Sequence, residues 1–197
     1  MSDHAPPPVI TTPPSDTQRR LALTYAAFHE THAPRWRLYA QLHTGEREAA
    51  GAVARDTFAQ LRRQWPHALR RRSAACYAWS LLKEHLHRWL TDRERPSALE
   101  LTAFQRAAHA LPREFPRQCA LVESRIGLYA ALARLPERQC DSLVLHTMIG
   151  YSTAQIAELL GIEESAVRCQ IRHARRKLAP FAPPAPTAGV PHSVRGT

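Results

Sequence analysis

Arginine side chains gather near the C-terminal end of the chain, in the stretch STAQIAELLGIEESAVRCQIRHARRKL at residues 152–178. A planar guanidinium can bond O6 and N7 of guanine together, so Arg168 and Arg172 are candidates for base contacts in a DNA major groove. Arg175, Arg176 and Lys177 follow directly and are expected to hold the phosphate backbone. The chemistry predicted for this stretch is noncovalent recognition of DNA.

These cations can act together only if their segment forms one helix with two different faces. At about 100° per residue, a narrow apolar stripe is formed by Val167, Ile171, Ala174 and Leu178. The opposite face carries Ser165, Arg168, Cys169, Arg172, His173 and Arg176. The pattern predicts a helix that packs on one side and contacts DNA on the other, and a merely solvated basic face is the alternative.

A second, shorter helix is expected just before it. Ser152 stands three residues before Gln155, which is the spacing of a capping box, and the apolar positions Ile156 and Leu159 follow. Gly161 then supplies the left-handed conformation that a tight turn needs. Together the two helices and their turn predict a helix-turn-helix, whose second helix enters the major groove.

The overall charge agrees with an anionic partner. The 197 residues include 27 Lys and Arg against 17 Asp and Glu, a formal net charge of +10. Such a surplus attracts polyanions in a salt-dependent way. The chain has no apolar run of about twenty residues and no signal-peptide pattern, so we expect a cytoplasmic protein without a membrane partner.

Metal, cofactor and catalytic sites are not indicated. Cys76, Cys119, Cys140 and Cys169 are far apart and form no zinc-ligand spacing, and they are expected to be reduced thiols. His29 and His32 could share a helix face but lack further ligands. We therefore predict no enzyme activity. A redox role for Cys169, favoured by neighbouring arginines, is the alternative to a small neutral contact residue.

The remaining pattern predicts an all-α fold of two small helical domains joined by a linker. The expected parts are a disordered tail at 1–17, a helical bundle at 18–92, a linker at 93–122, a four-helix domain at 123–178 and a disordered Pro-rich tail at 179–197. The bundle should contain a helix from near Arg19, a new helix after Pro34, a helix from about Glu46 that Pro66 stops, and one over 73–90.

Several side chains are assigned to the core or to surfaces by this pattern. We expect Ala54, Phe58, Leu61 and Trp65 to be buried, and Cys140, Leu143, Val144 and Met148 to point inward. Trp79 and Trp89 are interpreted as core residues, with stacking on extruded bases as the alternative. Arg70, Arg71 and Arg72 form a basic cluster that either contacts phosphates or is simply solvated.

The segment from Ala131 to Leu178 resembles region four of bacterial RNA polymerase sigma factors, particularly the extracytoplasmic-function (ECF) group. The resemblance is carried by LPERQ at 135–139, IAELLG at 156–161, Val167-Arg168 and the ARR run at 174–176. It implies that the helix-turn-helix binds the minus-thirty-five element of promoter DNA. Cys169-Gln170 stand where the family commonly has Ser-Arg, and His173 where it has Arg or Lys, which implies a different promoter sequence or weaker reading.

The N-terminal block looks like a degenerate region two of the same group, the domain that binds core RNA polymerase. The family's acidic clamp-binding motif corresponds to residues 52–56, where only Asp56 keeps a carboxylate and Arg55 lies beside it. The resemblance implies polymerase binding through Arg55 and Asp56, weakened by the missing acidic groups. It also implies that an anti-sigma factor could be a partner.

Three functions stay open on this basis. The first is an ECF-like sigma factor that binds core polymerase and directs initiation at promoters. The second is a sigma-derived DNA-binding regulator that no longer engages polymerase, which the missing acidic motif favours. The third is a protein-interaction module whose bundle binds a regulatory protein. Competition with core polymerase for the bundle surface would separate the third from the first.

Overall fold

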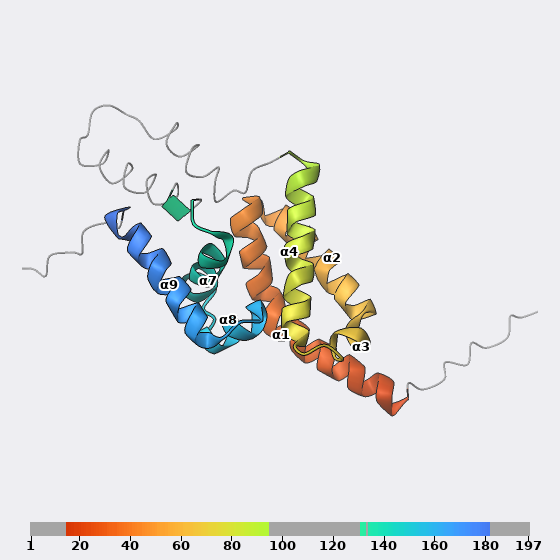
Figure 1. Cartoon of the computed structure of the whole chain (residues 1–197). Helices are drawn as coiled ribbons and strands as arrows, with labels where there is room; N and C mark the ends of the chain where they lie inside the picture. The colour runs from red at the N-terminus through yellow and green to blue at the C-terminus, as the bar shows by residue number, and fades with distance from the viewer. Residues whose placement is uncertain (1–14, 95–130, 133, 182–197) are drawn as a thin grey trace, which may run out of the picture.

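The structure, a computed structural model, describes residues 15–94, 131–132 and 134–181, and all regular elements in these ranges are helical, as predicted (Figure 1). The helices are α1 (Asp16–Thr44), α2 (Arg47–Arg63), α3 (Trp65–Ala68), α4 (Ala74–Asp92), α7 (Glu137–Thr147), α8 (Thr153–Leu160) and α9 (Glu164–Leu178). Most of the linker predicted at 93–122, the first part of the four-helix domain predicted at 123–178 and most of both predicted tails lie outside the described residues. At the edge of the second tail, Ala179–Phe181 form a short 3-10 turn instead of a disordered chain.

α1 begins earlier than the periodicity predicts. Its first residue is Asp16 rather than a residue near Arg19, because Ser15 and Gln18 form a reciprocal capping box. The Ser15 hydroxyl accepts from the Gln18 N–H at 3.3 Å, and the Gln18 side chain accepts from the Ser15 N–H at 3.0 Å. Two otherwise free backbone donors are thereby satisfied, which places the helix start at this point.

The second helix expected after Pro34 does not exist as a separate element, because α1 runs through this residue. A proline inside a helix removes one hydrogen bond and costs about 3 kcal/mol. The rings of His29 and Trp36, on either side of Pro34, both pack against Phe58 of α2, with centroids 4.6 and 5.2 Å away. We attribute the continuity of α1 to this packing on α2.

The core of the N-terminal bundle lies between α1, α2 and α4. The four residues predicted to be buried on the second helix, Ala54, Phe58, Leu61 and Trp65, are all buried. α2 ends at Arg63, and Pro66 lies in the first turn of α3 instead of stopping the longer helix, because proline is tolerated where the N–H has no helical partner.

The two tryptophans of α4 differ in their surroundings. Trp79 is 5% exposed and packs edge-on against Trp36 and Tyr39, so the core interpretation is confirmed. Trp89 is half-buried, and the Arg93 guanidinium lies 4.6 Å from the centre of its ring.

In the C-terminal part, α7, α8 and α9 pack around Leu143, Val144, Ile156 and other apolar side chains. Met148, expected to point inward, is instead 48% exposed. This residue follows the last turn of α7, where the chain leaves the helix, and the next residue, Ile149, fills the buried position.

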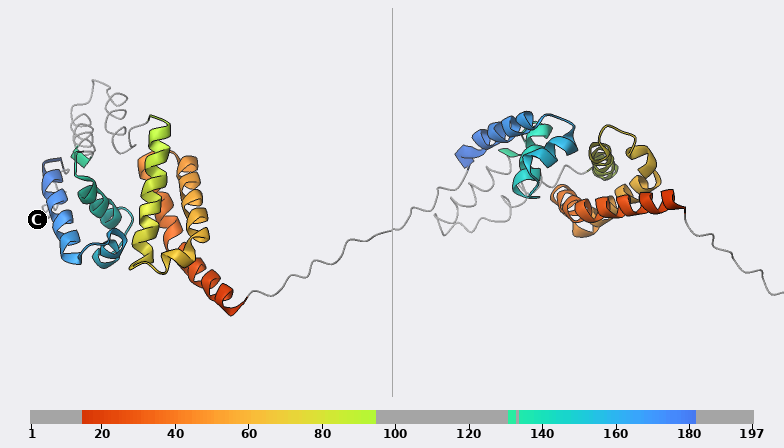
Figure 2. Two further views of the ribbon diagram at one scale, coloured as in Figure 1. Left: turned by 45° about the vertical axis from the view of Figure 1, so that its right-hand side comes forward. Right: turned by 90° about the horizontal axis from the view of Figure 1, so that it is seen from below.

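The two blocks are not separated in the structure (Figure 2). α4 packs against α8, and the buried residues of both blocks form one continuous cluster. The Tyr39 hydroxyl on α1 donates to Asp141 of α7 at 2.5 Å, and Nδ1 of His32 lies 2.7 Å from the Tyr151 hydroxyl. The helix-turn-helix therefore packs directly against the N-terminal bundle. The domain boundaries themselves stay a prediction.

Candidate nucleic-acid interface

The local hydrogen bonds of the helix-turn-helix confirm the predicted capping and turn. The Ser152 hydroxyl accepts from the Gln155 N–H at 3.2 Å, and the Gln155 side chain accepts from the Ser152 N–H at 3.0 Å. Gly161 ends α8 with φ +65°, in the left-handed region, and its N–H donates to the Ala157 carbonyl. The Ile162 N–H donates to the same carbonyl, so that both residues of the turn are tied to α8.

α9 has the two predicted faces. Its buried residues are Val167, Ile171, Ala174 and Leu178, as expected from the apolar stripe. Of the residues predicted to contact DNA, six are exposed (Ser165, Arg168, Arg172, Arg175, Arg176 and Lys177) and two, Cys169 and His173, are half-buried. The structure thus brings these side chains onto the outer side of one helix. Contact with DNA itself stays a prediction.

Arg168 has a partner that the sequence reasoning missed. Its guanidinium lies 2.7 Å from a carboxylate oxygen of Glu164, one turn earlier on α9. The Thr153 hydroxyl, at the start of α8, donates to the same oxygen at 2.6 Å, and this hydrogen bond is the main cause of a lowered Glu164 pKa. The i, i+4 spacing of Glu164 and Arg168 was the signal available in the sequence.

Cys169 lies among basic side chains. Its Sγ is 3.9 Å from Nδ1 of His173 and 3.8 Å from a guanidinium nitrogen of Arg172. The thiol, imidazole and guanidinium together form a compact, polar patch in the middle of the outer face of α9. The redox role of Cys169 stays a prediction.

Gln170 takes no part in the outer face. The Ser142 hydroxyl of α7, which is fully buried, donates to the Gln170 side chain at 2.5 Å. Gln170 therefore anchors α9 to α7. Among the departures from the family pattern, only Cys169 and His173 lie on the surface predicted to read bases.

The basic cluster before α4 lies beside the helix-turn-helix. Arg71 and Arg72 line a cleft of about 920 Å³ together with Gly161, Glu158 and Glu163 from α8 and the turn. Both arginines are exposed, and Nε of Arg71 donates to His67 at 3.1 Å. The packing of α4 on α8 thus places two further cations next to the turn that precedes α9.

Arg55 and Asp56, predicted to bind polymerase, are both exposed but face different clefts of the bundle. Arg55 lines the groove between α1 and α2, whereas Asp56 lines a cleft between α2 and α4 that also contains Arg88 and His85. The structure therefore does not gather the two residues into one pocket. Neighbouring residues of a helix point about 100° apart, which accounts for this divergence.

Within residues 15–94, 131–132 and 134–181, no three His, Cys, Asp or Glu side chains converge as they would around a metal ion. In the same ranges, none of the helices combines the length and the apolar composition needed to cross a bilayer.

Comparison with known proteins identifies the helix-turn-helix part. Residues 125–178 match the family model described as sigma-70, region 4. The chain is also 42% identical over 60 residues to proteins named ECF RNA polymerase sigma factor SigM in two strains of Mycobacterium tuberculosis. That match covers 30% of this chain and 31% of each relative, so the chain spans about a third of the length of the curated relatives it matches.

The family match and the geometry concern the same residues. The region 4 match contains α7, α8 and α9, and α9 presents the arginines of the outer face. Residues 125–178 are therefore similar to region 4 of sigma-70 proteins, and the described part of this match contains the helix-turn-helix of α8 and α9.

Proposed function

We propose that the protein is an ECF-like sigma factor, which binds core RNA polymerase and directs transcription initiation at promoters that α9 recognises. One observation carries the proposal: within a region 4 match, the apolar stripe of α9 is buried and its other side exposes Arg168, Arg172 and Arg176. A helix packed in this way can enter the major groove with its arginine side chains facing the DNA.

In this proposal the protein acts by binding and catalyses no reaction itself. Arg168 and Arg172 select bases, while Arg175, Arg176 and Lys177 bind phosphates. Arg71 and Arg72, placed beside the turn by the packing of α4, add phosphate contacts. The N-terminal bundle docks on polymerase, and Asp56 supplies the one carboxylate kept from the family's acidic motif.

The test of polymerase binding uses the full chain, labelled with a fluorophore and titrated with purified core RNA polymerase. We expect submicromolar affinity that Asp56→Ala weakens, because an interfacial charge pair is lost. Asp16→Ala, an exposed carboxylate at the start of α1, is the matched control. Binding that both variants leave unchanged would remove Asp56 from the contact.

A second candidate, a DNA-binding regulator without polymerase engagement, is favoured by the arginine at position 55. If the folded protein selects a preferred duplex from a randomised pool but binds no core polymerase up to 10 micromolar, this candidate replaces the first. Loss of both activities in the folded protein would leave the protein-interaction module as the remaining function.

A further inference from the structure

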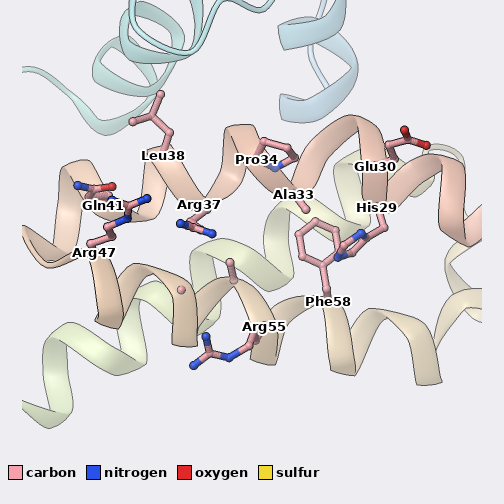
Figure 3. A pocket seen from close by; sticks show the side chains of 12 residues that line it. His29, Glu30, Ala33, Pro34, Arg37, Leu38, Gln41, Arg47, Arg55 and Phe58 are labelled. Carbon is pink, nitrogen blue, oxygen red and sulfur yellow. The ribbon is translucent and has the colours of Figure 1, made fainter.

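A groove runs between α1 and α2 in the N-terminal bundle, with α4 lying behind these two helices (Figure 3). Its volume is about 760 Å³. α1 faces α4 with Trp36, Tyr39 and His43, whereas a different side of α1 faces the groove. The residues that carry the argument are Ala33, Pro34, Arg37 and Leu38 from α1 and Arg55 and Phe58 from α2.

Three arginines give this groove a positive charge. Arg37, Arg47 and Arg55 line it, all three are exposed, and none of them forms an ion pair with the described part of the chain. Among the described residues that line the groove, Glu30 is the one carboxylate. Three neighbouring guanidinium groups without counter-charges repel one another and favour an anionic ligand.

The groove also contains apolar surface. Ala33, Pro34, Ala54 and Phe58 contribute to its lining, and the Leu38 side chain at its rim is 43% exposed. Figure 3 shows the arginines toward one end of the groove and His29 with Phe58 toward the other. A ligand that contacts both the basic and the apolar end of the groove must carry acidic and apolar groups together.

Gly51 leaves room for one of the arginines. A Cβ added at this position would stand 3.3 Å from a guanidinium nitrogen of Arg55. The Arg55 side chain therefore lies back along α2, close to the glycine, at the edge of the groove.

We propose that this groove binds an acidic, amphipathic helix of a partner protein. A helix packs naturally along the groove between two others, as in known helix-in-groove complexes. Its leucine-like side chains would cover Phe58 and Leu38, and its carboxylates would pair with Arg37, Arg47 and Arg55. Nucleic acid fits less well, because phosphates would leave the apolar lining uncovered.

The test uses the full chain and a fluorescein-labelled peptide of 14 residues, in which leucines at helical i, i+4 spacing alternate with glutamates. Anisotropy is expected to give a Kd in the range of tens of micromolar. A peptide with glutamine in place of every glutamate should bind at least tenfold more weakly. Arg37→Gln and Arg55→Gln should each weaken binding of the acidic peptide about fivefold, and Leu38→Gln about threefold.

Arg20→Gln is the matched control, since Arg20 is an exposed arginine of α1 outside the groove. All substituted side chains are exposed, so circular dichroism should show unchanged helix content. No peptide binding up to 1 mM, or equal losses in Arg20→Gln and Arg37→Gln, would overturn the proposal. So would a labelled single-stranded DNA that binds the groove variants more weakly while the peptide does not. None of these outcomes depends on DNA recognition by α9.

Discussion

Lys83 on α4 donates to Asp141 on α7, with 3.0 Å between Nζ and Oδ2, and so joins the N-terminal bundle to the region 4 domain. Asp141 is 5% exposed and also accepts from the Tyr39 hydroxyl, and Glu137 lies 2.7 Å from Nζ. Burial raises the pKa of Asp141, which Lys83 opposes. Burial alone would lower the pKa of Lys83, but Asp141 and Glu137 raise it.

Replacing Lys83 with methionine should destabilise the protein, because Asp141 would stay buried without a cation. We expect a loss of about 1 to 3 kcal/mol in the free energy of unfolding by urea at pH 7, less than for a fully buried pair, since the Lys83 side chain is 24% exposed. The raised pKa of Asp141 makes its folded form bind a proton more tightly, so the deficit should shrink from pH 7 to pH 5. Lys177→Met, at an exposed lysine, is the control. Equal stabilities of the two variants would refute a stabilising role for Lys83.

Gly161→Ala should cost more stability than Gly150→Ala, although both glycines have positive φ, at 65° and 80°. Each alanine pays about 1 to 2 kcal/mol for the left-handed conformation. At Gly161 the new Cβ would also stand 2.9 Å from Sγ of Cys76 on α4, whereas at Gly150 no atom lies within 4 Å.

We expect the free energy of unfolding of Gly161→Ala, measured in urea, to fall by about 1 kcal/mol more than that of Gly150→Ala, because modest overpacking costs about this much. Adding Cys76→Ala to Gly161→Ala should recover that extra loss, which a double-mutant cycle measures. If both alanine variants lose similar stability and Cys76→Ala shows no coupling with Gly161→Ala, then close packing of Cys76 against Gly161 does not limit the residue at this turn.

His43 should make the protein less stable in acid. Burial, followed by the nearby Lys83, lowers its pKa to about 3, and burial with Arg35 lowers the pKa of His32 to about 4. Between these values and the ordinary 6.5, the unfolded chain binds protons that the folded chain does not. Stability is therefore lost as the pH falls below about 6.5, by up to ~1.4 kcal/mol per pH unit for each histidine that stays neutral in the folded protein.

The measurement is urea unfolding at pH 7, 6 and 5. In His43→Gln, less stability should be lost between pH 6 and pH 5 than in the unsubstituted protein. The loss that remains should come in part from His32. His87→Gln, at an exposed position of α4, is the control variant. A profile that His43→Gln does not alter would mean that this imidazole does not stay neutral in the folded protein.

Base reading and phosphate binding should separate on α9. Arg168→Ala should cost about 1 to 3 kcal/mol on the preferred duplex and relax selection at one base pair. Lys177→Ala should weaken all sequences similarly and reduce the salt slope by about one unit. If Arg168→Ala and Lys177→Ala lose the same affinity for every DNA sequence, Arg168 does not read a base.

The ion pair with Glu164 adds a third variant to that experiment. Glu164→Gln removes a negative charge from the side of α9 that is predicted to face DNA and frees the Arg168 guanidinium. We expect tighter binding to all duplexes, by about 0.5 to 1 kcal/mol at low salt, and weaker discrimination between them. Anisotropy on preferred and scrambled duplexes measures both effects. Unchanged discrimination would mean that Glu164 does not orient Arg168.

The helix-turn-helix was readable from the sequence because its signals are local. A capping box spans four residues, Gly161 marks the turn, and the stripe from Val167 to Leu178 repeats with the helical period. The same capping signal is present at Ser15 and Gln18, but the helical periodicity alone predicts a later start, near Arg19. Both signals depend only on residues a few positions apart, which any helix brings together.

The sequence by itself determined the helical class, the two faces of α9 and the similarity of residues 125–178 to sigma-70 region 4. Only the tertiary structure decided that α1 continues through Pro34, that Gln170 turns inward to Ser142, and that α4 packs on α8. Lys83 and Asp141 are 58 positions apart, and no local pattern encodes such a pair. The physical reason is that hydrogen bonds within a helix follow from neighbouring residues, whereas contacts between helices depend on how their buried side chains fit together.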